Sequence, residues 1–180
     1  MQTLPENLSS RYMGLGEKFA SSYLLSSEGN HRESLARYLE ILNDEESDIV
    51  LYEAAVQYHH LGDLPECEAF LERSYRLNSS NLLCCIGLVQ LYCDTGRHEV
   101  ALQLLATMIE TGIEKEQALL YMGDIYRDTE RFDKAIDCYS KMLAGPYARD
   151  AAERLVPLLE MSGRSTDAQA LFKRYLKGCC

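Results

Sequence analysis

The chain has 180 residues, of which 47% are hydrophobic and 26% are charged, as is ordinary for a folded globular protein. Its formal net charge of −10 argues against direct nucleic-acid binding, because phosphate-binding surfaces need clustered Lys and Arg. No run of about 18 apolar residues is present, so no membrane span is predicted.

Residues 1–14 form a leader with no apolar period, and they lack the basic start and apolar core of a secretory signal. The seven cysteines are odd in number and scattered, which suits a reducing compartment better than a disulfide framework. We therefore expect a cytoplasmic or nuclear protein.

Two helical hairpins are predicted next. The first helix covers about residues 15–26, and residues 27–30 make its turn. Ser47 then provides an N-cap for the second hairpin. Pro65 marks the start of that hairpin's second helix, because proline is tolerated in the first helical turn.

The clearest hairpin lies in residues 117–146, where apolar residues recur every three or four positions. Gly123 lies on the apolar face of the first helix. An interior glycine costs a helix about 1 kcal/mol against alanine, so its presence suggests that another helix passes very close. Gly145 and Pro146 are expected to end the second helix.

The last hairpin contains two irregular features. Pro157 predicts a kink or a late start of its first helix, because proline removes a backbone hydrogen bond. Its second helix carries Leu171, Phe172, Tyr175 and Leu176 close to the last residues of the sequence. These side chains either pack back onto the hairpin's own first helix, or are covered by a partner or sister subunit, or belong to a longer array of which this sequence is a part.

These hairpins repeat at a nearly constant distance. Gly62, Gly96, Glu130 and Gly163 occupy one frame, with steps of 34, 34 and 33 residues, and each is followed five residues later by a small residue. Five units of a single array are predicted: residues 15–47, 48–81, 82–115, 116–148 and 149–180.

The repeated pattern resembles the tetratricopeptide repeat (TPR) family, whose signature is W-x2-L-G-x2-Y…A-x3-F…P. Its matches in residues 116–148 are Leu119, Met122, Gly123, Tyr126, Ala135, Tyr139 and, one residue early, Pro146. The resemblance implies an all-α, right-handed α-solenoid of antiparallel helical hairpins. It also implies protein binding rather than catalysis.

The resemblance further implies that the first helices line a concave groove. The predicted groove residues are Phe19, Tyr23, Ile49, Tyr52, Val56, His59, Leu83, Ile86, Gln90, Cys93, Gln117, Leu120, Asp124, Arg127 and Asp128. Such a groove would be apolar toward its N-terminal end and acidic toward its C-terminal end. It would fit a protein segment with apolar anchors and basic residues. The alternative is that several of the apolar side chains pack between helices.

No catalytic residues and no cofactor motif are predicted, because no phosphate-binding loop or paired nucleophile and base is present. His59 and Cys93 could approach one another in adjacent repeats, but zinc-ligand spacing is missing, so no metal site is predicted. A Cys/His metal protein is the minor alternative. Cys179 and Cys180 resemble a prenylated end, but no lipidation is expected, because the GTPase domain that such proteins use is missing.

The predicted role is a scaffold or adaptor subunit of a larger intracellular assembly. The alternative is a client-holding chaperone that resembles the TPR chaperones of bacterial type III secretion. Those chaperones are typically three-repeat arrays, so five repeats favour the assembly subunit.

Overall fold

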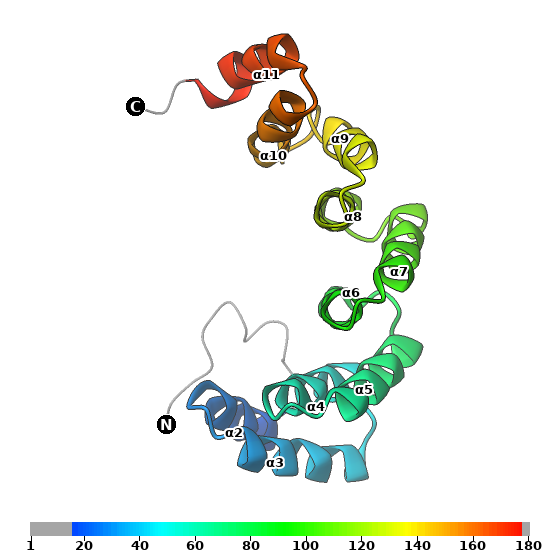
Figure 1. Cartoon of the computed structure of the whole chain (residues 1–180). Helices are drawn as coiled ribbons and strands as arrows, with labels where there is room; N and C mark the ends of the chain where they lie inside the picture. Colours follow the sequence, from blue (N-terminus) through cyan, green and yellow to red (C-terminus); the bar gives the residue numbers. More distant parts are fainter. Residues whose placement is uncertain (1–15, 178–180) are drawn as a thin grey trace. The chain divides into compact units, whose positions relative to one another are not determined.

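The computed structural model describes residues 16–177, which are helical and contain no strand (Figure 1). The predicted leader, residues 1–14, and the pair Cys179 and Cys180 lie outside the described residues. The helices are α2 (Gly16–Ser27), α3 (His31–Asp44), α4 (Asp48–His60), α5 (Leu64–Leu77), α6 (Leu82–Asp94), α7 (His98–Thr111), α8 (Lys115–Asp128), α9 (Phe132–Ser140), α10 (Ala148–Met161) and α11 (Ser165–Leu171), and α11 continues into a π-helix, η1 (Phe172–Leu176).

The chain divides into two compact units, residues 1–91 and 92–180, and the division falls within α6. In the first unit α2 packs against α3, α3 against α4, and α4 against α5. In the second unit the contacts again run between successive helices, from α7 to α11 and η1. No helix in residues 16–177 combines the length and the apolar character that crossing a membrane requires.

One backbone turn recurs between the two helices of each hairpin. In the α4–α5 turn the N–H of Gly62 donates to the His59 carbonyl at 3.0 Å, and the next N–H donates to the Tyr58 carbonyl at 2.9 Å. Gly62 has a φ of +80°, a conformation that strains residues with a Cβ. The α8–α9 turn places Glu130 in the same role, with a φ of +59°.

Replacing Glu130 with glycine should therefore stabilise the protein, because it relieves a left-handed conformation that costs L-residues about 1 kcal/mol. We expect E130G to raise the free energy of unfolding by about 0.5–1 kcal/mol in urea titrations followed by circular dichroism. The matched control is G62A, since nothing lies within 4 Å of a Cβ built on Gly62 and only its φ opposes the change. A loss of stability in E130G would contradict this account of the turn.

The two helices of a hairpin approach closely where a small residue faces a large one. A methyl group on Gly123 in α8 would lie 2.5 Å from Cε1 of Tyr139 in α9, and Tyr139 is fully buried. The expectation that another helix passes close to Gly123 is thus confirmed. The corresponding residues of the first hairpin are Ser22 and Tyr38, and both are also fully buried.

The last hairpin departs from this pairing. The position of Gly123 is held there by Val156, and Phe172, at the position of Tyr139, is 49% exposed. The helix widens into the π-form η1 at Phe172. The hydroxyl of Tyr175 nevertheless donates to the Leu143 carbonyl at 3.1 Å, so the end of the helix remains packed within this unit.

Two predicted boundaries are corrected. The helix α10 begins at Ala148 and continues through Pro157, so a late start is wrong. The helix α9 ends at Ser140, before the predicted stop at residues 145 and 146. Beyond Ser140, the N–H groups of Met142 and Leu143 donate to carbonyls three residues earlier, which is turn geometry and not α-helix.

The G123A substitution should destabilise the protein by about 1–3 kcal/mol, because the new methyl group overlaps the Tyr139 ring. Adding Y139L should restore part of this loss, since leucine already faces alanine at the equivalent positions Leu71 and Ala55. Urea unfolding of G123A, Y139L and the double variant measures the coupling. If the two changes proved additive, the ring would not be the obstacle.

Candidate functional site

Two pockets adjoin one another on the first unit, between the first helices of successive hairpins. The larger has a volume of about 290 Å³ and is bounded by α2, α4 and α6. Its lining residues are Tyr23, Ser26, Ser27, Tyr52, Glu53, Val56 and Leu83. The smaller, of about 150 Å³, shares Tyr52 and Val56 with the larger pocket and extends along α4. Together the two pockets are called the apolar groove.

The close approach of α6 to its neighbours shapes the smaller pocket. A Cβ on Gly87 would lie 3.1 Å from Cδ2 of Leu71 in α5 and 3.5 Å from Cε2 of Tyr52 in α4. The pocket continues from Tyr52 toward His59 and Gln90. Any side chain larger than that of glycine at position 87 would therefore crowd this pocket.

The acidic side chain of the groove lining is Glu53, which is only 6% exposed. Burial, and secondly the charge of Glu53, raise the pKa of Tyr23. The first unit carries 14 acidic against 6 basic side chains, a formal charge of −8, whereas the second carries 14 against 12, a charge of −2. The excess of negative charge therefore lies in the unit that holds the apolar groove.

The predicted groove residues of the first unit fall into three groups. The residues that line the apolar groove are Tyr23, Tyr52, Val56, His59, Leu83 and Gln90. Ile49 and Ile86 are half-buried but are not among the lining. The prediction for Phe19 is wrong, because its side chain is fully buried, with its ring centroid 5.5 Å from that of Tyr38.

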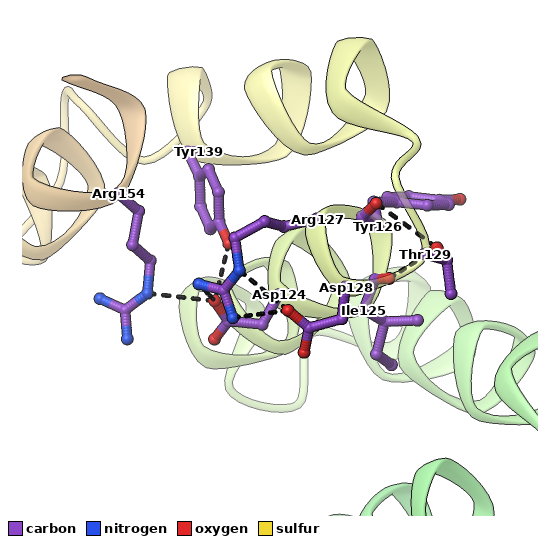
Figure 2. Close-up of polar contacts among 8 residues, drawn as sticks. All are labelled: Asp124, Ile125, Tyr126, Arg127, Asp128, Thr129, Tyr139 and Arg154. Carbon is purple, nitrogen blue, oxygen red and sulfur yellow. Dashed lines mark hydrogen bonds and ion pairs between the residues drawn. The ribbon is translucent and has the colours of Figure 1, made fainter. Parts of the chain in front are cut away.

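In the second unit, the predicted residue Asp124 is the centre of a polar network (Figure 2). Its Oδ1 accepts hydrogen bonds from the Tyr139 hydroxyl at 2.7 Å, from Nη1 of Arg127 at 2.9 Å and from Nε of Arg154 at 3.2 Å. Arg127 also pairs with Asp128 at 2.9 Å. Burial and the bond to Asp124 raise the pKa of Tyr139 far above its usual range.

This network corrects the expected acidic end of the groove, since two carboxylates face two guanidinium groups and their charges compensate. Sequence reasoning missed Arg154, which follows Asp124 by 30 residues and so lies one helical turn short of the full repeat distance. The remaining predicted residues Cys93, Gln117 and Leu120 are half-buried. Leu120 packs against the core of the unit, as the packing alternative supposed.

A third pocket, of about 960 Å³, lies between α7, α8 and α9 and was not predicted. Leu119, Met122 and Tyr126 of α8 contribute to its apolar lining. Nζ of Lys134 lies 5.4 Å from the centre of the Tyr126 ring at this pocket. The predicted site residues were restricted to the groove-facing side of the first helices, so this pocket was not among them.

Four of the five cysteines within the described residues are packed in the interior, and Cys93 is half-buried. Cys67, Cys84, Cys85 and Cys138 are buried, and burial raises the pKa of Cys67 to about 11 and that of Cys84 to about 12. Within residues 16–177 no three His, Cys, Asp or Glu side chains form a group that could hold a metal ion.

Known structures resemble this fold. A crystal structure of MamA is 18% identical and has a TM-score of 0.72 over 87% of this chain and 92% of that one. MamA from Desulfovibrio magneticus RS-1 is 16% identical, with a TM-score of 0.70 over 91% and 96% of the two chains. The C-terminal part of a TPR repeat-containing protein from Cytophaga hutchinsonii is 14% identical, with a TM-score of 0.72 over 88% of this chain and 64% of that one.

No protein-family model and no curated protein sequence matches the chain. At these identities the likeness concerns the fold alone. The predicted fold class, an all-α, TPR-like solenoid of helical hairpins, is confirmed.

The contribution of the Asp124 network to the stability of the protein can be measured by substitution. D124A should lower the free energy of unfolding by about 1.5–3 kcal/mol, because it leaves a buried tyrosine hydroxyl and two guanidinium groups without their shared acceptor. D128A is the matched control, since its carboxylate is 63% exposed and a surface pair contributes at most about 1 kcal/mol. Equal effects of the two substitutions in urea unfolding would show that Asp124 is not a hub.

Proposed function

We propose that this protein is a non-enzymatic protein-interaction module that binds a partner segment in the apolar groove. The observation that supports the proposal is that six of the predicted groove residues line two adjoining pockets between first helices. In this proposal the chain is a single TPR-like array of five hairpins. It acts in the cytoplasm or nucleus as a scaffold or adaptor subunit of a larger assembly.

The dimensions and chemistry of the groove favour a protein segment. Pockets of about 290 and 150 Å³ are smaller than most small-molecule sites, which begin near ~300 Å³, and they suit individual side chains. Tyr23, Tyr52 and Leu83 supply apolar contact area for such side chains. The partner segment would therefore place apolar anchors in the two pockets.

Basic residues should accompany these anchors. Glu53 lies in the wall of the larger pocket, and the first unit carries a formal charge of −8. A Lys or Arg beside the anchors would be attracted to this surface, and the attraction would weaken as salt is added. The compensated network at Asp124 offers less attraction, so we place the basic contacts on the first unit.

A client-holding chaperone is the second candidate, since the same groove could hold exposed apolar segments of a client. The excess of negative charge favours the adaptor role, because it selects among apolar segments by their basic residues. A chaperone would accept apolar segments whether or not they carry basic residues.

Selection from a random peptide display library, with the whole chain immobilised, tests the proposal. We expect the selected sequences to combine aromatic or aliphatic anchors with Lys or Arg. A synthetic peptide of the selected sequence should bind Y52A and Y23A at least tenfold more weakly than the unsubstituted protein, as measured by fluorescence anisotropy.

The matched control is Y147A, which removes the same kind of side chain from an exposed position outside the groove. Circular dichroism must show that each variant remains folded. Unchanged affinity in folded Y52A and Y23A would overturn the groove as the binding site. Selection of apolar peptides without basic residues would instead favour the chaperone.

A further inference from the structure

Three histidines gather where α3 begins and α4 ends. The imidazole rings of His31 and His60 are stacked, with centroids 4.3 Å apart and planes inclined by 12°. The ring of His59 meets that of His60 edge-on at 6.1 Å. The side chains in contact between α3 and α4 are therefore imidazoles, whose charge changes between pH 5 and 8.

A buried amide holds one member of the stack in place. Gln57 is fully buried and lies on α4, one turn before His60. Its Nε2 donates to the Glu53 carbonyl at 3.2 Å, so its Oε1 is the atom that accepts from Nδ1 of His31 at 2.9 Å. With Nδ1 committed as a donor, His31 can take up a further proton only at Nε2.

The charged groups of the turns and of α3 beside the stack have other partners within residues 16–177. Glu28, in the turn before α3, accepts a hydrogen bond from Nδ2 of Asn30, and Glu33 on α3 pairs with Arg37 at 2.8 Å. Asp63, in the turn after α4, caps α5 through the Glu66 N–H. His59 adds a second titratable ring on the side of α4.

We infer that the stacked His31 and His60 rings form a pH-sensitive latch, which holds α3 against α4 when the rings are neutral and loosens when both are protonated. Two positive charges at this separation repel one another, and protonation of His59 adds a third. The stacking contact between α3 and α4, which is favourable at neutral pH, would become repulsive in acid.

The direction of the pH effect agrees with the burial of His60. Burial, then the charges of His31 and His59, lower the pKa of His60 below its usual 6.5. The unfolded chain therefore binds more protons than the folded chain once the pH falls through about 6.5. The latch contributes its full stability above that pH and loses it progressively below.

The latch bears on the apolar groove, and this consequence rests on the proposed function. α2, which supplies Tyr23 to the larger pocket, packs against α3, and the latch joins α3 to α4, which supplies Tyr52. Loosening the α3–α4 contact would let the two walls of that pocket move apart. Acidification would then weaken the binding of a partner segment.

The test uses the whole chain and needs no ligand. In an NMR titration of the histidine rings, His60 should titrate below pH 6.5, and H31Q should raise its midpoint. In hydrogen exchange corrected for intrinsic rates, the opening of α3 and α4 amides should rise more than twofold and at most about tenfold from pH 7.5 to 5.5, since one suppressed histidine permits up to about tenfold per pH unit. H31Q/H60Q should reduce this rise to less than twofold.

The control is H98Q, which removes a histidine from α7 and should leave the pH response of α3 and α4 unchanged. A midpoint of His60 at or above 6.5 in the unsubstituted protein would overturn the latch, whether or not the double variant folds. So would a full pH response in folded H31Q/H60Q. Binding of the selected peptide at pH 7.5 tests the groove separately, so either idea can fail alone.

Discussion

The structure depends on the close approach of the two helices within each hairpin. Where α8 offers the bare backbone of Gly123, the Tyr139 ring of α9 fills the space against it. Ser22 and Tyr38 occupy the equivalent positions of the first hairpin and are equally buried. In the last hairpin Val156 replaces the small residue, and Phe172 is exposed at the start of a π-helix. A small residue on the first helix therefore makes room for the aromatic ring of the second helix in the first and fourth hairpins.

The same packing determines the electrostatics of the second unit. Because the Tyr139 ring is fixed against Gly123, its hydroxyl reaches Asp124 on the next position of α8. That contact and Arg154 of α10 turn an apparently acidic surface into a compensated network (Figure 2). Charges counted along the chain could not predict this, since Arg154 belongs to a different hairpin. The larger excess of negative charge belongs to the first unit.

In the first unit, one helix serves both packing and the proposed binding. α4 presents Tyr52 and Val56 to the apolar groove, whereas Gln57 and His60 of the same helix contact His31 of α3. Tyr52, Val56 and His60 follow one another at intervals of four residues and so lie along one stripe of α4, and Gln57 lies beside that stripe. A change in the charge of His60 can therefore alter the position of the groove residues that lie on the same helix.

The sequence by itself determined the helical hairpins, their nearly constant period and the close approach at Gly123, because these depend on apolar spacing and on residue size within one repeat. It also identified Tyr23, Tyr52 and Leu83 as groove candidates from their repeat positions. Only the tertiary structure decided that Phe19 is buried, that Arg154 neutralises Asp124, and that His31 stacks on His60. These outcomes depend on side chains from different helices, whose distance in space cannot be obtained from the period of one helix.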